Sequence, residues 1–226
     1  MDGILLVDKP VGWTSHDVVA KVRGVIKRET GQKVKVGHTG TLDPAASGLM
    51  VLVLGSYTKR AGEFSKLDKS YEAELTLGAL STTGDAEGEI TQKSSEKPSP
   101  EQIKNVLSDF DGQIEQIPPV YSAIKVNGQR AYKMARKGEK PVLEPRKVTI
   151  YEISVLDYKY PKLQIKTRVS SGTYIRSLAE NIGENLDTGA YLSALRRTSV
   201  GTLQLKDALE LAAIDKLSIS DILKLH

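Results

Sequence analysis

Hydrophobic and polar residues recur along this chain with the periods of both strands and helices. The apolar run over residues 3–7 predicts a short strand, and the run MVLVLG over residues 50–55 predicts a buried one. Residues 70–77 alternate between polar and apolar side chains, as in a strand with one buried face. Further strands are expected over residues 145–157, 162–170 and 192–200.

Helical spacing of apolar residues marks several segments between these strands. A first helix is expected from Thr14 or Ser15, either of which is a suitable N-cap, to about residue 28, and Gly31 ends it. Pro100 occupies the first position of a second helix, which runs to about Phe110. Other helices are expected over residues 174–186, in a basic segment ending near Lys137, and over residues 207–225. Because helices and strands mix without regular βαβ alternation, the predicted class is α+β with a largely antiparallel sheet.

The composition excludes several kinds of chemistry. The chain has 226 residues, enough for one large domain or for one domain plus an elaboration. It contains no cysteine and three histidines, His16, His38 and His226. Disulfide frameworks, thiolate nucleophiles and cysteine-based zinc sites are therefore excluded, and so few histidines argue against a His-rich metal centre. No stretch approaches the roughly 18 consecutive apolar residues of a membrane span, and the first residues lack the features of a signal peptide. We therefore expect a cytoplasmic protein.

Positive charge is concentrated in one segment. Residues 121–147 hold eight basic and two acidic residues, a net charge of +6 against a total of +4, so the rest of the chain sums to −2. Tyr121 and Tyr132 lie within the segment, and the stretches PPVYS and EPRK flank it. Cations interleaved with aromatic rings suit a polyanion such as nucleic acid, and the alternative is a basic surface loop without a partner. The flanking prolines predict an insertion that stands off the core.

The sharpest local motif is GHTGTLDPAASGLMVLVLG, residues 37–55. Gly37 and Gly40 permit tight turns. Pro44 fixes the backbone after Asp43 and favours an extended Asp43, so the carboxylate is held at the end of a rigid element and can project into a cleft. The alternative is an Asp-Pro turn whose carboxylate caps nearby amides. The chain has no Rossmann, P-loop, GxSxG, HExxH or zinc-deaminase signature.

Two other residues occupy informative positions. The segment SSGTYIRSLAENIG, residues 170–183, places Arg176 in the first turn of a helix. A cation is unfavourable at that end of the helix dipole, so Arg176 needs an anion or a carboxylate from elsewhere, unless it is an ordinary surface arginine. Tyr71 opens the alternating strand after Lys69 and Ser70, where it could stack on a base or fill the core.

Five blocks of the sequence follow one another in the order known from one enzyme family. They are GILLVDKPVGWTSHDVV, GHTGTLDPAASGLMVLVLG, KSYEAELTLG with STTGDAEGEI, IPPVYSAIKVNGQRAYKMARKGE, and RVSSGTYIRSLAENIG with ALRR. Together they resemble the TruB family of tRNA pseudouridine synthases, over residues 3 to about 200. The identification rests on these ordered blocks, whereas the composition only permits it.

The resemblance implies a reaction that needs no cofactor and no metal. Members of the family convert the uridine at position 55, in the T loop of tRNA, to pseudouridine. The base is detached from N1, turned, and rejoined through C5. Two other functions stay open: a tRNA-binding or folding module in which chemistry is incidental, and a base-flipping glycosylase that releases free uracil. Asp43, Tyr71 and Arg176 together argue against mere binding, since binding needs none of them.

The resemblance also implies a fold. It is a mixed, mainly antiparallel central sheet flanked by helices and loops, in one catalytic domain over residues 1–226 with an RNA-gripping insertion at about 118–147. Many members carry a further C-terminal RNA-binding domain of the PUA type, for which the tail of this sequence is too short. The chain is therefore expected to be either a compact member or a fragment. The expected partner is the T stem-loop of tRNA, and the expected enzyme is a monomer that binds no membrane.

The site residues follow motif by motif. Asp43 is the implied catalytic residue, acting either as a nucleophile at C1′ or as a base at C2′. Arg176 matches the arginine that pairs with this aspartate, and Tyr71 matches the tyrosine that stacks on the uracil. The remaining substrate-binding positions are Leu195, which lines the pocket, and Tyr174 and Lys9 at the edge of the cleft.

The target base must be extruded from the folded T loop before a carboxylate can reach it, at a cost on the order of a few kcal/mol. His38 matches the histidine that fills the vacated space, and its alternative is a hydrogen-bonding loop residue. The basic segment matches the insertion of the family, with phosphate contacts that give affinity and salt dependence. The residues expected to contact RNA are Lys125, Arg130, Lys133, Arg136 and Lys137.

Overall fold

The computed structural model of the chain describes residues 1–122, 124–126, 128–135, 137–139 and 141–216. The chain divides into two compact units, the first made of residues 1–71 and 195 onward, the second of residues 72–194. Two strands, β4 (Lys69–Leu77) and β12 (Ala190–Val200), contribute residues to both units. The sequence predicts one catalytic domain, and no local pattern in it marks this division.

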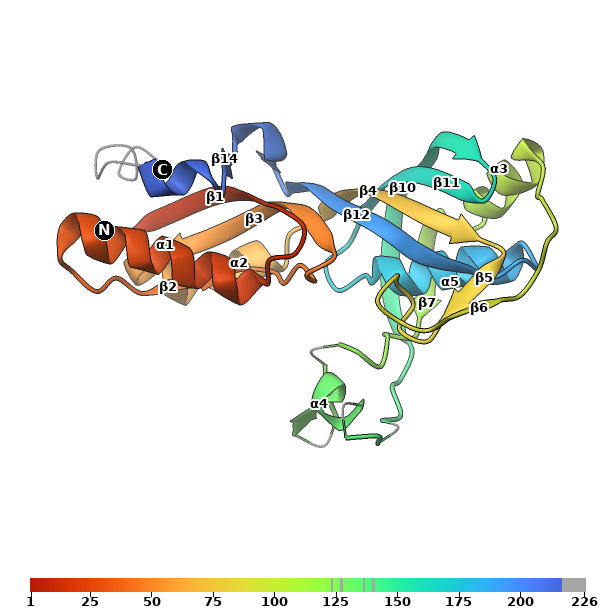
Figure 1. The fold of residues 1–226 in the computed structure, drawn as a ribbon, viewed down its shortest axis with the longest axis horizontal. Coiled ribbons are helices and arrows are strands. Elements are labelled where there is room, and N and C mark those ends of the chain that lie inside the picture. The colour runs from red at the N-terminus through yellow and green to blue at the C-terminus, as the bar shows by residue number, and fades with distance from the viewer. Residues whose placement is uncertain (123, 127, 136, 140, 217–226) are drawn as a thin grey trace. The chain divides into compact units, whose positions relative to one another are not determined.

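The first unit is built on β3 (Ala46–Leu54), which has neighbours on both edges (Figure 1). β1 (Gly3–Lys9) pairs antiparallel with β3 along one edge. On the other edge, β2 (Val36–His38) pairs antiparallel near the end of β3, and β12 pairs parallel near its start. The short strands β13 (Leu203–Gln204) and β14 (Leu209–Glu210) extend the sheet beside β12 and β1. The sheet is therefore mixed and mainly antiparallel.

Helix α1 (Ser15–Thr30) covers one face of this sheet and confirms the first predicted helix. Thr14 is the N-cap, and its hydroxyl accepts a hydrogen bond from the Asp17 amide while the Asp17 carboxylate accepts one from the Thr14 amide. Gly31 ends the helix with φ 69°, a left-handed conformation that costs glycine least. The buried face packs into the core of β1 and β3; it consists of Val18, Val19, Val22, Val25 and Ile26.

The opposite face of β1 and β3 is covered as well. Leu49 and Val51 are buried together with Val200, and Phe64 from α2 (Ala61–Ser65) packs against them. A 3₁₀ turn, η1 (Gly55–Arg60), joins β3 to α2. Because both faces are covered, β3 is buried at every residue except Ser47, which confirms the buried strand, although it begins four residues before the predicted run.

The end of the described chain differs from the expectation of helices over residues 207–225. It contains two 3₁₀ turns, η2 (Leu205–Asp207) and η3 (Ala213–Lys216), and between them β14. β14 runs parallel to β1 and was not predicted, because its two residues are too few for an alternating pattern. The remainder of that prediction lies outside the described residues.

In the second unit the strand order is β12-β4-β11-β10-β7. β10 (Arg146–Lys159) and β11 (Lys162–Val169) confirm the strands expected over residues 145–157 and 162–170, and the structure pairs them as an antiparallel hairpin. β7 (Gly112–Gln116) pairs with the first part of β10. A separate ribbon joins β5 (Ala79–Ser81) to β6 (Ile90–Gln92). The expected mainly antiparallel sheet is confirmed here too.

Two helices complete this unit. α3 (Pro100–Ser108) begins after a capping box of Ser99 and Gln102, as the Pro100 signal predicts. α5 (Ile175–Asn185) confirms the helix expected over residues 174–186 and buries most of its first two turns. None of the helices in the described ranges is long and apolar enough to cross a bilayer.

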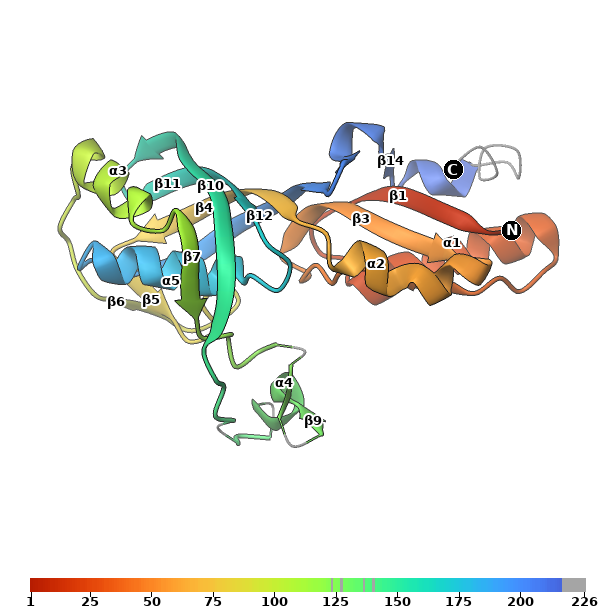
Figure 2. The same ribbon diagram turned by 180° about the vertical axis from the view of Figure 1, so that it is seen from behind.

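Between β7 and β10 the chain leaves the sheet of the second unit as the predicted insertion. It carries a two-stranded hairpin, β8 (Lys125–Val126) and β9 (Gln129–Arg130), and the short helix α4 (Ala131–Ala135). Both views show the segment around α4 standing apart from that sheet (Figures 1 and 2). Gly128, between β8 and β9, has φ 83°, a left-handed conformation that glycine adopts at little cost. Asn127 lies outside the described residues.

Candidate functional site

Asp43 is an exposed residue of the loop that joins β2 to β3 in the first unit. The backbone on each side of it is fixed. The Ser15 hydroxyl accepts a hydrogen bond from the Leu42 amide at 2.8 Å and donates one to the Leu42 carbonyl at 2.9 Å. The Gly12 amide donates to the Pro44 carbonyl at 2.8 Å, and the Ala46 amide donates to the Asp43 carbonyl at 3.0 Å. The carboxylate is thus presented from a rigid frame that includes the first turn of α1.

Lys9, at the end of β1, is fully buried beside this loop. Its ammonium donates to the carbonyls of Pro10 at 2.9 Å, Trp13 at 2.7 Å and Pro44 at 3.5 Å. Burial lowers the pKa of Lys9, the carboxylate of Asp43 opposes this effect, and the guanidinium of Arg197 adds to it. Lys9 therefore supports the loop from inside.

Arg197, on β12, is the second buried cation of the loop, with an exposed fraction of 2%. Its Nε donates to the Leu49 carbonyl at 2.7 Å, and its two Nη atoms donate to the carbonyls of Gly40 at 3.1 Å and Thr41 at 3.5 Å. No motif in the sequence marks Arg197 for a role. It joins the start of the Asp43 loop, at Gly40 and Thr41, to β3 at Leu49.

Gly48 allows β12 to approach β3 this closely. Its φ is 103°, and a Cβ atom at this position would lie 2.3 Å from the carbonyl oxygen of Arg197. Such a contact is impossible without moving the backbone, so a residue with a side chain would separate the two strands.

Lys69 is a third cation near the loop. Its ammonium donates to the carbonyls of Ser65 at 2.9 Å and Leu67 at 2.6 Å. Burial first, and then the charge of Arg197, lower the pKa of Lys69 to about 8. A Cβ atom on Gly40 would contact both the Arg197 guanidinium and the Lys69 side chain, which shows how closely the two cations flank the loop.

The Arg197→Met variant is expected to lower the free energy of unfolding by about 2–3 kcal/mol, because the three carbonyls around Arg197 lose their donor. Urea denaturation measures this. Arg60→Met is the control, since Arg60 is exposed and pairs with Glu63 at the surface, where an ion pair contributes about 1 kcal/mol or less. Equal losses in the two variants would contradict a supporting role for Arg197.

The other predicted residues of the first unit have different surroundings. His38, on β2, is half-buried, and its Nδ1 is buried without a hydrogen-bond partner in the described part of the chain. Burial lowers the pKa of His38, and the charges of Arg197 and His16 add to this, so the imidazole is neutral at pH 7. The alternative, that His38 is a hydrogen-bonding loop residue, is not supported at Nδ1, because this atom has no partner in the described part of the chain. Leu195 is half-buried opposite Ala46, and Tyr71 is buried.

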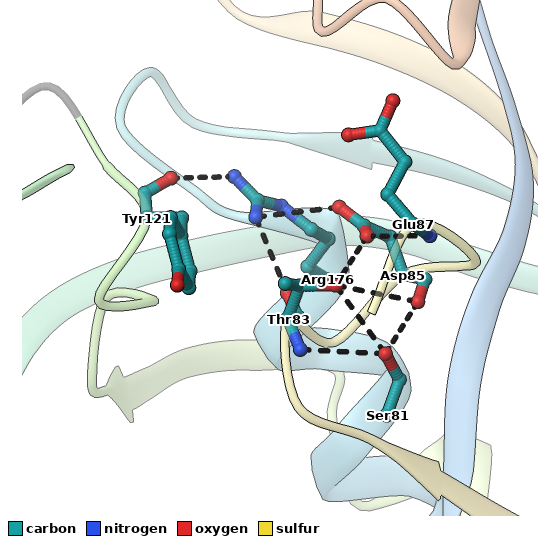
Figure 3. Close-up of polar contacts among 6 residues, drawn as sticks. All are labelled: Ser81, Thr83, Asp85, Glu87, Tyr121 and Arg176. Carbon is teal, nitrogen blue, oxygen red and sulfur yellow. Dashed lines mark hydrogen bonds and ion pairs between the residues drawn. The ribbon is translucent and has the colours of Figure 1, made fainter. Parts of the chain in front are cut away.

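Arg176 lies in the first turn of α5 in the second unit and is buried, so the alternative of an ordinary surface arginine is wrong. Figure 3 shows its guanidinium between two loops. Nη2 donates to the Tyr121 carbonyl at 2.8 Å, and Nη1 donates to the Thr83 carbonyl at 3.2 Å. Nη1 also lies 3.4 Å from Oδ2 of Asp85. Asp85 is therefore a carboxylate partner of the kind expected for a cation in the first turn of a helix.

Asp85 is the carboxylate partner of Arg176, and no motif in the sequence predicts this role. Its carboxylate accepts hydrogen bonds from the Thr83 hydroxyl at 2.5 Å and the Glu87 amide at 3.1 Å (Figure 3). The Ser81 hydroxyl donates to the Asp85 carbonyl. These bonds close the turn around Asp85, so its second oxygen is aimed at Arg176. The acidic segment TTGDAEGEI was the available signal, but it predicts only a turn.

Glu180, one turn further along α5, is also close to this pair. Burial raises the pKa of Glu180, the Arg176 charge opposes this effect, and the Asp85 charge adds to it. Tyr174 is the N-cap residue of α5, and both its amide and its carbonyl bond to the side chain of Gln116.

The basic residues of the insertion are exposed. They are Lys125, Arg130, Lys133 and Lys137, and none of them forms an ion pair within the described part of the chain. Arg136, also expected to contact RNA, lies outside the described residues. Among the residues described, no three His, Asp or Glu side chains come together as a metal site.

Comparisons with known proteins agree with the resemblance. Residues 27–175 match the model of the N-terminal domain of TruB family pseudouridylate synthases. The chain is 45% identical over 217 residues to tRNA pseudouridine synthase B of Dechloromonas aromatica, covering 96% of this chain and 71% of that protein. It is 45% identical over 226 residues to the protein of the same name from Phocaeicola vulgatus, covering 97% and 96%.

The fold also matches solved structures. In the crystal structure of a Cbf5-Nop10-Gar1 complex, the matching chain has a TM-score of 0.73 and 31% identity, over 94% of this chain and 54% of that one. In an H/ACA RNP bound to a substrate RNA containing 2′-deoxyuridine, the TM-score is 0.69 with 28% identity, over 94% and 52%. The chain thus spans about half the length of these solved chains.

Proposed function

The chain belongs to the TruB family of pseudouridylate synthases, and from this premise we propose that it modifies the uridine at position 55 of tRNA with Asp43 as its catalytic carboxylate. Its relatives are tRNA pseudouridine synthases, and the chain accordingly isomerises uridine to pseudouridine in tRNA. The T loop as the site of modification follows from the resemblance of the five sequence blocks. Because tRNA is the substrate, we also propose a cytoplasmic enzyme, and we keep the monomer expected from the resemblance as part of the proposal.

The rigid frame around Asp43 is the observation that best supports a catalytic role. Ser15, Gly12 and two buried cations, Lys9 and Arg197, all bond to the backbone of this loop. A reacting group held in one geometry removes much of the entropic cost of reaching the transition state. An Asp-Pro turn that served only to cap nearby amides would not require this support.

The reaction conserves every atom of the nucleotide. The bond between N1 and C1′ breaks, the uracil turns, a bond forms between C5 and C1′, and the proton leaving C5 is balanced by one gained at N1. Asp43 takes part either by attacking C1′ or by removing the proton at C2′, and both roles need an ionised carboxylate. Tyr71 is proposed to stack on the uracil and to lie near the C5 proton, and Arg176 to pair with Asp43.

Extrusion of the base leaves a space in the T loop, and we propose that His38 fills it. The neutral state of its imidazole suits this role, because burying a charged ring between bases costs more than burying a neutral one. Leu195, half-buried beside Ala46, is proposed to line the uracil pocket. Lys9 supports the Asp43 loop from within the core, whereas the resemblance suggested the edge of a cleft.

The test of this function is incubation with an unmodified tRNA transcript, followed by mapping of pseudouridine at single-nucleotide resolution. Modification at position 55, and none in a transcript with cytidine there, is the expected result. Mass analysis separates the alternatives, since an isomerase leaves the RNA mass unchanged and a glycosylase releases uracil. A pure binding module would leave the RNA unmodified.

Neutralising Lys133, Arg136 and Lys137 together with glutamine is expected to weaken tRNA binding and flatten its salt dependence. Each phosphate contact contributes about 0.7–0.9 to the slope of log K against log salt, so the slope should fall by up to about 2–3. Filter binding across a salt series measures it. A triple glutamine variant of Lys27, Lys33 and Lys35, exposed cations of the first unit, is the control. An unchanged slope would remove RNA contact from the insertion.

A further inference from the structure

The segment that leads from β7 into the insertion is fastened to the first turn of α5. The Gln116 side chain is buried, accepts a hydrogen bond from the Tyr174 amide at 2.8 Å and donates one to the Tyr174 carbonyl at 3.1 Å. One residue later, the Ile117 carbonyl accepts a bond at 2.8 Å from the hydroxyl of Ser177, which is also buried. The two residues that hold this segment, Tyr174 and Ser177, lie on either side of Arg176 in the sequence.

A third attachment is made by Arg176 itself. Its Nη2 donates to the Tyr121 carbonyl at 2.8 Å. Between the second and third attachments lie Pro118 and Pro119, whose rings restrict the backbone. The position of the Tyr121 carbonyl therefore depends on a short link that starts at Ile117, where Ser177 holds it. Because Arg176 Nη2 bonds to that carbonyl, the position of the guanidinium depends on the same link.

The next residue connects the same link to the insertion. The Ser122 carbonyl accepts a hydrogen bond from the Tyr132 amide at 3.1 Å, and the Ile124 carbonyl accepts one from the Ala131 amide at 2.8 Å. Ala131 and Tyr132 belong to α4, the helix that carries Lys133. Two adjacent carbonyls thus bond in different directions, one to Arg176 and the other to the helix expected to contact RNA.

The link has room to move. A hollow of about 350 Å³ lies beside it, lined among others by Pro118, Pro119, Tyr121, Ser177 and Glu180. Tyr121 has an exposed fraction of 39%, so its ring is not locked in a core. A shift of α4 can therefore move the Tyr121 carbonyl without repacking the unit.

We propose that residues 117–122 couple RNA contact by the insertion to the placement of the Arg176 guanidinium, with Gln116 and Ser177 as positioning residues. The coupling rests on the proposed function in two respects, that the insertion contacts RNA and that Arg176 serves the active site. Binding of RNA shifts α4 or restricts its motion. Residues 117–122 then change the position or the mobility of the Arg176 guanidinium. By thermodynamic linkage, the placement of Arg176 affects the insertion in return.

Two variants weaken the link without removing Arg176 or a basic residue. Ser177→Ala removes one attachment, and the double variant Pro118→Gly/Pro119→Gly keeps every attachment but loosens the backbone between them. Both are expected to lower the single-turnover rate at saturating tRNA about tenfold while the Kd for tRNA changes less than about threefold. Ser177→Thr, which retains the hydroxyl, is expected to restore most of the rate.

The matched control is Ser108→Ala in α3, because the Ser108 hydroxyl also donates to a backbone carbonyl, that of Asn105, but away from the link. It is expected to leave both the rate and the Kd unchanged, and thermal melting confirms that each variant is folded. If the double proline variant fails to fold, the Ser177 series decides alone. An unchanged rate, or a weakened Kd with an unchanged rate, would overturn the proposal.

A second readout does not depend on activity. The NMR signal of the Arg176 Nε–Hε group, identified by its loss in Arg176→Lys, is expected to shift when a T stem-loop RNA is added to the wild-type protein. The shift should be strongly reduced in Pro118→Gly/Pro119→Gly. If the RNA is bound but the signal does not move, the coupling is wrong. If the signal moves but no pseudouridine forms, the coupling stands and the proposed function fails.

Discussion

Replacing Asp43 with asparagine is expected to lower the rate of pseudouridine formation at least a thousandfold. An amide has nearly the same shape as the carboxylate but can act neither as a nucleophile at C1′ nor as a base at C2′. The hydrogen bonds that fix this loop join backbone atoms to Ser15, Gly12, Lys9 and Arg197, and they do not need the carboxylate. The variant should therefore keep its fold and its affinity for tRNA.

Single-turnover assays on a tRNA transcript measure the rate, and filter binding measures the affinity. Asp109→Asn, an exposed position at the end of α3, is the control and should retain full activity. A fully active Asp43→Asn enzyme would remove Asp43 from the chemistry. Loss of tRNA affinity in parallel with the rate would instead give Asp43 a role in binding.

The second large effect is expected for Arg176→Lys, a fall in rate of at least a hundredfold. The planar guanidinium reaches the carbonyls of Thr83 and Tyr121 and the carboxylate of Asp85 at the same time. A lysine ammonium is a single point charge on a longer flexible stem, so it cannot hold all three partners in one geometry. The charge is kept, so a loss of rate reports on geometry.

The control for this substitution is Arg168→Lys on β11, an exposed arginine that stacks over Tyr151. It should leave the rate within about twofold of the wild type. Thermal melting separates an effect on the reaction from an effect on folding. Near-normal activity of Arg176→Lys would contradict the proposed pairing of Arg176 with Asp43.

Most of the secondary structure could be predicted because its signals are local. Thr14 with Asp17, and Ser99 with Pro100, start α1 and α3 through contacts within one turn. β11 alternates between exposed and buried residues along its whole length, whereas β10 is irregular and has two register shifts against it, so alternation marks β11 more clearly than β10. β14 and the division into two units could not be predicted, since both depend on pairing between distant segments.

The same distinction explains which site residues were found. Asp43 and Arg176 each stand out locally, one before a proline and the other at the wrong end of a helix dipole. Arg197 has no such signal, because its partners Gly40 and Leu49 are about 150 residues away in the sequence. Asp85 likewise acquires its role only when the fold brings it to Arg176, 91 positions later.

Gly48 has a consequence for attempts to redesign this enzyme. A Cβ atom there would collide with the backbone of β12 and not with a movable side chain, so no rotamer change relieves the contact. Every amino acid other than glycine is therefore barred from this position, a few residues after Asp43. Variant libraries that aim to change the RNA target should keep Gly48. They should randomise exposed residues of the Asp43 loop instead, such as Thr41 and Ala45.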